Sequence, residues 1–307
     1  HEGDPDLFLL GEKCALFRNN GSAGFSDQTA DFPFVAGRAV DGVLFDLIAD
    51  TSGKDLVVLY EDKPAVLYKD KLAGKYEASS LDLLPGGGKS IVACDINNDG
   101  WTELVAAYPT GLRIAFNRNG RLEAGVAPDP ARGPVLLADF ENRALLDLFA
   151  AGSIFRSQGQ GRYTSTASDS LGKSAAVAAA DFNEDGLVDL AQIANDGSLH
   201  LLTNRTQTQN HWLRASLAGI KNAKLAPGAI IEVKAGPYYQ KRTYLGIPIV
   251  FGVRSQREID TVRITWPNGL VQNQPKQPAD KPELFKEAQR LSGSCPMIFT
   301  WNGREFE

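Results

Sequence analysis

Two short stretches of the sequence carry acidic side chains at a spacing that can bind a metal ion. They are DINNDGWTEL at 95–104 and DFNEDGLVDL at 181–190. Oxygen-bearing side chains stand at positions 1, 3, 5 and 9 of each stretch, and glycine at position 6 permits a sharp bend. This spacing, completed by the carbonyl of position 7, suits a hard cation, and calcium fits best. The expected ligands are Asp95, Asn97, Asp99, the Trp101 carbonyl and Glu103, and then Asp181, Asn183, Asp185, the Leu187 carbonyl and Asp189.

Two other interpretations of these turns can be weighed from the residues. An EF-hand needs glutamate at position 12 and flanking helices, but position 12 is Ala106 or Gln192 and the flanks are strand-like. A metal-free turn is the second alternative, because Asp, Asn and Gly populate tight turns in any case. We favour the metal, because several carboxylate and amide oxygens that converge without a cation repel one another.

The acidic turn belongs to a longer repeat. Its last acidic residue recurs at intervals of 42 to 49 residues, and each copy is followed by an apolar run and then by short segments rich in Gly, Asn and aromatic residues. The five copies end at Asp6, Asp55, Glu103, Asp147 and Asp189. A period of this length, with several short strands and no amphipathic helical run before residue 280, predicts four-stranded propeller blades. The small-sided SIVACD (90–95) and SAAVAAAD (174–181) suit innermost strands crowded at a propeller axis. A buried alanine-rich helix is the competing interpretation.

These turns and the LFRNNG…GF-type segments resemble the FG-GAP or VCBS repeats of integrin-alpha-like β-propellers, over residues 1–208. The resemblance implies an all-β fold with a ring that usually has seven blades. Because five repeats are visible and the first turn lacks its first four positions, we expect the propeller to be N-terminally incomplete, with further blades upstream. A closed five-bladed ring is the alternative.

Two copies depart from the pattern. The copy that begins at Asp139 has Arg143 at position 5 and Ala144 in place of glycine. The copy at 46–55 has Ile48 near position 3 and one extra residue. We expect both to lack calcium. In the first, we expect the Arg143 guanidinium to take the metal's place among the carboxylates of Asp139, Glu141 and Asp147. A loop without an ion need not keep a left-handed residue at position 6, which would explain why Ala144 is tolerated there.

A second resemblance begins where the repeat ends. NHWLRASLAG (210–219), APGAIIEVKAG (226–236) and IDTVRITWPNGLVQ (259–272) look like the ASPIC/UnbV domain that commonly follows such propellers. Alternation in IIEVK and TVRITW independently predicts strands. We therefore expect a small β-rich domain at 209–272. We expect 273–307 to hold a Pro/Gln/Lys-rich linker, a short helix in ELFKEAQRL and the start of a further strand-rich segment.

Composition narrows the classes of partner. The 307 residues carry a net charge of −5 without a Lys/Arg block, which argues against nucleic acid. No run reaches eighteen apolar residues, and no signal peptide is recognisable, so we expect no membrane insertion by this chain. Three distant cysteines, without a CxxC pair, argue against a zinc ribbon or a redox motif but leave one disulfide possible.

Little in the sequence points to catalysis. There are three histidines and no HExxH, GxSxG or GxxxxGK(S/T) motif, and we expect His200 to be a plain strand residue. We expect no catalytic residue and a non-enzymatic, secreted, periplasmic or cell-surface calcium-binding module for protein or glycan binding or for assembly. A carbohydrate-active lyase or hydrolase and a structural subunit of a surface filament are the alternatives. The aromatic residues Trp101, Tyr108, Tyr238 and Tyr239 could contact a ligand, but such residues more often pack between blades.

Overall fold

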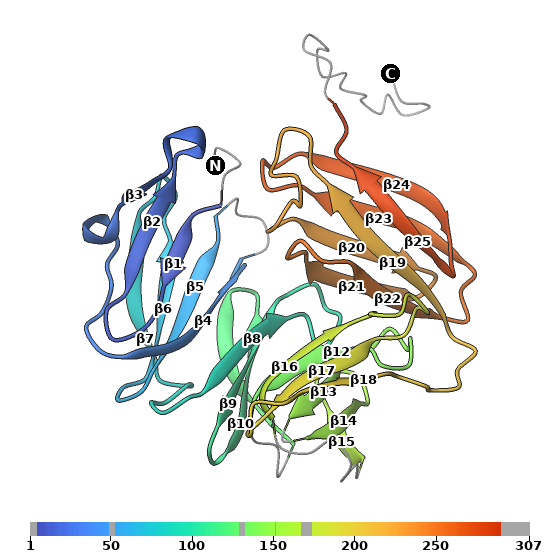
Figure 1. Cartoon of the computed structure of the whole chain (residues 1–307), viewed down its shortest axis with the longest axis horizontal. Helices are drawn as coiled ribbons and strands as arrows, with labels where there is room; N and C mark the ends of the chain where they lie inside the picture. Colours follow the sequence, from blue (N-terminus) through green and yellow to red (C-terminus); the bar gives the residue numbers. More distant parts are fainter. Residues whose placement is uncertain (1–4, 49–52, 129–132, 151, 167–173, 290–307) are drawn as a thin grey trace, which may run out of the picture.

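The computed structural model describes residues 5–48, 53–128, 133–150, 152–166 and 174–289. These residues form an all-β protein of antiparallel sheets that follow one another in chain order (Figure 1). Sheets 2, 3 and 4 have four strands each, as the repeat predicts, and sheets 1 and 5 have three described strands each. Sheet 1 holds β1 (Leu7–Leu9), β2 (Ala15–Asn19) and β3 (Phe25–Asp27); sheet 2 holds β4 (Ala39–Phe45), β5 (Asp55–Tyr60), β6 (Ala65–Asp70) and β7 (Tyr76–Leu81). Sheet 3 holds β8 (Ser90–Cys94), β9 (Glu103–Tyr108), β10 (Gly111–Arg118) and β11 (Arg121–Gly125). Sheet 4 holds β12 (Val135–Ala138), β13 (Asp147–Ala150), β14 (Ser153–Ser157) and β15 (Tyr163–Thr166); sheet 5 holds β16 (Ser174–Ala180), β17 (Asp189–Ala194) and β18 (Leu199–Leu202).

The second strand of each inner sheet is buried on both faces. In β5, Val57 and Leu59 pack in a cluster shared with sheet 3, whereas Val58 and Tyr60 pack in a cluster shared with sheet 1. The same alternation links sheet 3 to sheets 2 and 4 through β9. This packing explains the uninterrupted apolar runs that follow each acidic residue, because a strand covered on both sides needs no polar face. The acidic turns lie at the entry to these strands.

The chain ends in two further sheets. One has the order β22–β19–β25 and the other β21–β20–β23–β24, and their shared core includes Trp266 and Phe251. The strands are β19 (His211–Ala218), β20 (Ile230–Ala235), β21 (Tyr238–Thr243), β22 (Ile249–Arg254), β23 (Glu258–Thr265), β24 (Val271–Pro278) and β25 (Lys281–Lys286). Strand β25 runs parallel to β19, and the other pairings are antiparallel.

Two expectations for residues beyond 272 are wrong. The expected linker forms β24, which pairs with β23 at the edge of its sheet, where proline residues such as Pro275 are tolerated because one side of an edge strand needs no ladder. The expected helix begins instead as β25. Phe285 is buried in the core, and the Glu287 carboxylate accepts the backbone N–H groups of Ile220 and Asn222, at 2.7 and 3.0 Å. Tertiary packing thus overrides the local preference for helix. The strand-rich segment expected further on lies outside the described residues.

The alanine-rich stretch is the strand β16, and the helical alternative is wrong. The strand is not crowded as expected, because Ala175, Ala176 and Ala178 are exposed. Cys14 and Cys94 are both free, and Cys295 lies outside the described residues.

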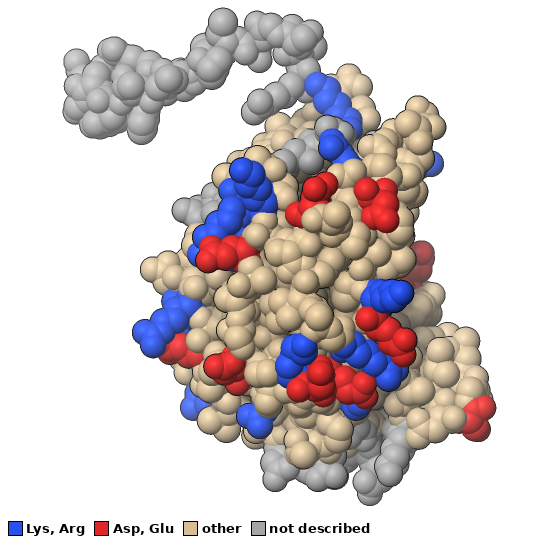
Figure 2. All heavy atoms as spheres, turned by 90° about the vertical axis from the view of Figure 1, so that its left-hand side faces the viewer, with Lys and Arg blue, Asp and Glu red and all other residues tan. Residues whose placement is uncertain are grey.

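The surface and the helices of the described part add two observations. Figure 2 shows basic and acidic side chains interspersed on the face formed by the N-terminal sheets, without a continuous basic patch on that face. Within the described ranges, no helix is both long and apolar enough to cross a bilayer.

Candidate metal centre

The turn between β8 and β9 wraps its backbone around the Asp95 carboxylate. That carboxylate accepts hydrogen bonds from the N–H groups of Asp99 and Gly100, at 3.1 and 2.9 Å. The N–H of Trp101 donates to Asp99 at 2.9 Å. Asn98 and Gly100 have positive φ angles of 60° and 88°, which curl the chain back on itself. The turn therefore has a fixed backbone shape that directs its side chains inward.

Three carboxylates converge inside this turn. Asp95, Asp99 and Glu103 each offer an oxygen, and these oxygens lie within 4.8 Å of one another. Glu103 is fully buried; its Oε2 accepts the Ile96 N–H at 3.0 Å, and its Oε1 has no hydrogen-bond partner. A buried carboxylate oxygen without a partner is costly, and a cation would satisfy it. The residues therefore fit a hard metal ion.

The pKa shifts of the acidic groups in this turn also favour a bound cation. Burial raises the pKa of Glu103 to about 8, and the nearby carboxylates of Asp95 and Asp99 add to the rise. Burial also raises the pKa of Asp95. The ionised forms are therefore unfavourable together, and a divalent cation would stabilise them. Asn97 is bound to Asp99 by its side-chain amide at 2.9 Å, and Trp101 is half-buried beside it.

The turn between β16 and β17 repeats this geometry. The N–H groups of Asp185 and Gly186 both donate to Asp181 at 3.1 Å, and the Leu187 N–H donates to Asp185 at 2.9 Å. Asn183 donates to Asp185 at 2.9 Å, as its counterpart does in the first turn. Asp181 and Asp189 are buried, whereas Asn183 and Asp185 are exposed.

A basic side chain lies beside each of the two turns. Arg118 is 3.5 Å from Asp99 in the first turn, and Arg214 of β19 is 3.8 Å from Asp181 and 3.0 Å from Glu184 in the second. Among the residues that the structure describes, only the first turn brings three acidic groups within 4.8 Å. The first turn is therefore the better formed candidate for a metal.

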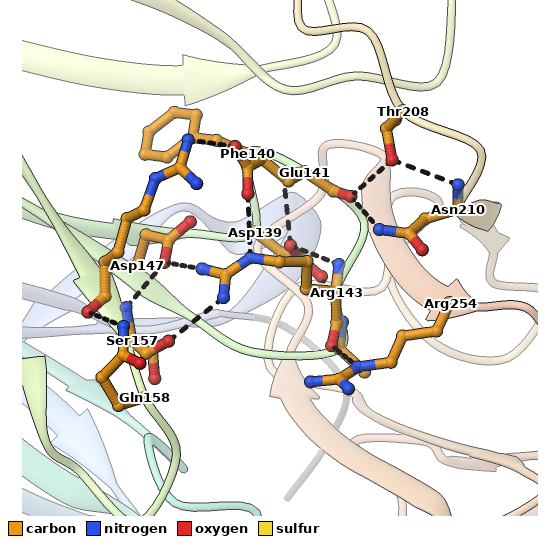
Figure 3. Close-up of polar contacts among 12 residues, drawn as sticks. Asp139, Phe140, Glu141, Arg143, Asp147, Ser157, Gln158, Thr208, Asn210 and Arg254 are labelled. Carbon is orange, nitrogen blue, oxygen red and sulfur yellow. Dashed lines mark hydrogen bonds and ion pairs between the residues drawn. The ribbon is translucent and has the colours of Figure 1, made fainter. Parts of the chain in front are cut away.

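In the turn at 139–147, an arginine lies among the acidic side chains (Figure 3). The Arg143 Nη2 is 2.5 Å from Asp147, and its Nε is 3.1 Å from Glu141. The backbone N–H groups of Arg143 and Ala144, not the guanidinium, donate to Asp139 at 2.8 and 2.7 Å. The expected pairing is thus confirmed for Asp147 and Glu141, and wrong for Asp139.

The explanation for Ala144 is also wrong, because position 6 of this turn keeps its left-handed conformation. Ala144 has φ 57°, and Asn142 has φ 55°, which match the equivalent positions of the first turn. The reason is that the Ala144 N–H must still reach Asp139, and only the curled backbone allows it. The hydrogen bonds to the first acidic residue, and not an ion, set the shape of the loop.

The irregular turn at 46–55 also carries its own cation. Lys54 Nζ lies 2.8 and 2.7 Å from the two oxygens of Asp46. Residues 49–52 of this turn lie outside the described ranges. Sequence reasoning missed Lys54. Its signal was a basic residue directly before the last acidic residue, where the metal-type turns have Thr102 and Val188.

The last acidic residue of the repeat has a structural task in four of the five copies. It accepts a backbone N–H from the end of the next strand along the chain, or from a residue shortly after it, which ties the turn to the sheet. The donors are Asn19 to Asp6 at 2.8 Å, Asp70 to Asp55 at 2.9 Å, Ser157 to Asp147 at 2.8 Å and Asn204 to Asp189 at 2.7 Å. In the turn at 95–103, the Asn117 N–H lowers the pKa of Glu103, but Glu103 Oε1 has no hydrogen-bond partner. Recurrence of this residue is therefore weak evidence for a metal on its own.

The C-terminal sheets contact the three turns at 95–103, 139–147 and 181–189. Lys241 donates to the Gly100 carbonyl at 3.1 Å, and Arg254 donates to the Arg143 carbonyl at 2.6 Å. Trp212 covers Gly186 so closely that a Cβ there would lie 2.0 Å from the indole. Glycine at position 6 of the last turn thus serves packing as well as the bend.

The histidines and aromatic residues do not form a catalytic site in the described structure. Ser198 Oγ lies 2.8 Å from His200 and 2.6 Å from Asp196, so the serine stands between the other two, whereas a nucleophilic triad needs the histidine there. His200 lies on β18, as expected, and His211 pairs with Asp280 at 2.6 Å.

In three of the four aromatic residues singled out from the sequence, the side chain contacts a polar or charged group of the fold. The Tyr108 hydroxyl donates to the Pro85 carbonyl at 3.0 Å, Tyr239 donates to Glu232 at 2.9 Å, and the Arg254 guanidinium lies 5.0 Å from the centre of the Tyr238 ring.

Comparison with known proteins assigns this chain to no family. No protein-family model and no curated protein matches the sequence. A lectin of Agrocybe aegerita that recognises non-reducing terminal N-acetylglucosamine is 18% identical, with a TM-score of 0.48, over 65% of this chain and 63% of that one. The BP39L lectin of Burkholderia pseudomallei is 13% identical, with a TM-score of 0.47, over 87% and 90%. BBS1N, solved with ARL6DN, is 11% identical, with a TM-score of 0.42, over 89% and 75%.

Proposed function

We propose that this protein is a calcium-stabilised, non-enzymatic module for binding or assembly. The observation that carries the proposal is the convergence of Asp95, Asp99 and Glu103, with one Glu103 oxygen buried and unpartnered. A bound calcium ion would neutralise the cluster and hold the turn rigid. Asn97 and the Trp101 carbonyl would complete the oxygen ligands.

We assign residues 1–208 to part of an FG-GAP-type β-propeller, and the following sheets to an ASPIC/UnbV-type domain. Antiparallel four-stranded sheets that pack face to face in chain order support the first assignment. The strands β19, β20 and β23, which coincide with the matching segments, support the second.

We place the module outside the cytosol: secreted, periplasmic or on a cell surface. Extracellular calcium modules bind at about 10⁻⁴ to 10⁻³ M, so cytosolic calcium would leave such sites empty. The partner would be a protein, a glycan or further copies of the chain. Binding rather than catalysis is favoured because the carboxylates of the turns are engaged by backbone N–H groups or by basic side chains.

Calcium titration tests the proposal. We expect calorimetry to detect two ions per chain, the first in the turn at 95–103 and the second, with lower affinity, in the turn at 181–189. Anomalous scattering from crystals grown with calcium would locate them. If neither turn is occupied at millimolar calcium, the proposed role of the repeats is wrong.

A further inference from the structure

A cavity of about 180 Å³ opens between sheets 4 and 5, beside the turn that holds Arg143. One part of its lining is aliphatic and another part is polar. The aliphatic wall is made by Ile154, Val188, Leu190 and Leu202, and the polar side by Glu141, Arg156, Asn204 and Thr206. The cavity therefore combines an apolar surface with hydrogen-bonding groups, as ligand sites do.

The cavity exists because one side chain departs from the repeat. The pairings Leu104–Ala115 and Leu148–Phe155 are equivalent, so Phe116 of β10 and Arg156 of β14 share one register position. In sheet 3 the Phe116 ring fills the space toward sheet 4 and packs on Gly161, where a Cβ would come within 2.4 Å of it. In sheet 4 the arginine extends to the surface instead and leaves that space open.

The polar side of the cavity is held in place before any ligand arrives. Glu141 has the Arg143 Nε at 3.1 Å from one oxygen and forms an ion pair with Arg156 through the other. Asn204 donates to the carbonyls of Phe140 and Val188, at 2.8 and 3.1 Å. A pre-organised site loses little entropy on binding. Glu141 stands at position 3 of its turn, and its pairing with both arginines fixes the orientation of its carboxylate.

We propose that this cavity binds one neutral sugar residue of a glycan. Arg156, nearly half exposed at 46% of its side chain, supplies donors, and Glu141 beside it supplies an acceptor. Neighbouring hydroxyl groups of a sugar both donate and accept, and its C–H face can pack on the aliphatic wall. A neutral ligand suits the lining, because the charges of Arg156 and Arg143 are already paired with Glu141 and Asp147 and leave no unpaired positive charge for an anion. This inference rests on the proposed binding function and names its ligand class.

The test uses a panel of neutral monosaccharides, with glucuronate as the acidic comparison, measured by ligand-observed NMR and calorimetry on the whole chain. We expect at least one neutral sugar to bind and Arg156→Phe, which restores the filling residue of sheet 3, to weaken it at least about tenfold. Lys69→Phe is the matched control, because Lys69 has the same register position in sheet 2, away from the cavity. It should leave affinity unchanged.

Glu141→Gln is the second variant, in case Arg156→Phe does not fold, and it should also weaken binding because it removes the charged acceptor. Failure of every neutral sugar to bind at millimolar concentration would overturn the inference. So would equal affinity in the wild type and both variants, or preference for glucuronate. Calcium titration of the same samples separates the two proposals: a chain that binds calcium and no sugar refutes this site alone, and one that binds sugar through Arg156 without calcium refutes the metal proposal alone.

Discussion

The turns at 95–103 and 139–147 follow the same backbone path but neutralise their acidic groups differently. Both have positive φ angles at positions 4 and 6, and both wrap the first aspartate with the same two N–H donors. In the turn at 95–103, three carboxylates converge, and the exposed Arg118 lies 3.5 Å from Asp99; in the turn at 139–147, the Arg143 guanidinium stands among the acidic groups. The backbone thus sets the shape of both loops, and we propose that position 5 decides which cation each one holds.

The pKa directions reflect this difference. Burial raises the pKa of Glu103 to about 8 and that of its counterpart Asp147 only to about 6, because Ser157 and Arg143 stabilise the ionised form of Asp147. The turn at 46–55 uses Lys54 in a similar way. In both irregular turns, a basic side chain of the turn itself pairs with an acidic one.

The largest expected effect comes from removing Arg143, the basic side chain that pairs with the acidic groups of the turn at 139–147. Arg143→Ala leaves the buried Asp147 carboxylate without its ion-pair partner, and breaking a buried ion pair costs about 3 kcal/mol or more. We expect the free energy of unfolding to fall by that amount in urea titrations. Arg121→Ala is the control, because Arg121 pairs with Glu123 on the exposed surface, and it should leave stability unchanged. A loss no larger than that of the control would mean that Arg143 does not replace the metal.

The next effect is a pH dependence that belongs to the same turn. The pKa of Asp147 is about 6 in the folded protein, above its ordinary value of 3.8, so the folded state binds more protons than the unfolded chain between these values. Stability from this group is therefore full below about pH 4 and is lost as the pH rises through about 6, by at most about 3 kcal/mol. In Asp147→Asn the slope of unfolding free energy between pH 4 and 6 should become less negative than in the wild type. Identical slopes would contradict the assignment.

Calcium should act on the turn at 95–103 and not on the turn at 139–147. At free calcium tenfold above the dissociation constant, each occupied site should add about 1.4 kcal/mol to stability, and EDTA should remove it. Glu103→Gln should abolish this contribution at the first turn, because it removes a charged ligand. Asp196→Asn, a change in an exposed acidic residue away from every turn, should not alter the calcium dependence. A melting temperature that does not respond to calcium in the wild type would remove the distinction between the turns.

Two substitutions should convert the turn at 139–147 into a calcium-binding turn. Arg143→Asp together with Ala144→Gly restores the residue types of the first turn at positions 5 and 6, so the number of calcium ions bound per chain should rise by one. Calorimetry measures that number directly. An unchanged number in a folded double variant would show that position 5 alone does not decide the choice of cation.

The repeat, the all-β fold and the pairing of Arg143 with Asp147 and Glu141 could be predicted from the sequence, because each depends on local spacing. The sequence did not reveal β24 and β25. ELFKEAQRL by itself prefers a helix, but its first four residues form the end of β25, where Phe285 packs in the core. It did not reveal Arg214 beside Asp181 or the cavity at Arg156 either. Both depend on residues far apart in the chain, and no local pattern specifies them.

The smallest effect concerns the glycine at position 6. If that glycine served the metal, replacing it would abolish calcium binding; if it serves the backbone, the cost is only that of a left-handed residue with a side chain. Ala144 already adopts φ 57° in the turn at 139–147. A Cβ on Gly100 would meet nothing nearer than the Tyr239 ring at 3.8 Å. We therefore expect Gly100→Ala to fold, to lose about 1 kcal/mol of stability and to keep its calcium ion. Gly186→Ala is the contrasting variant, because its Cβ would collide with Trp212, and it should lose more stability than Gly100→Ala. Loss of calcium in Gly100→Ala, with the fold intact by circular dichroism, would show that position 6 is part of the metal site after all.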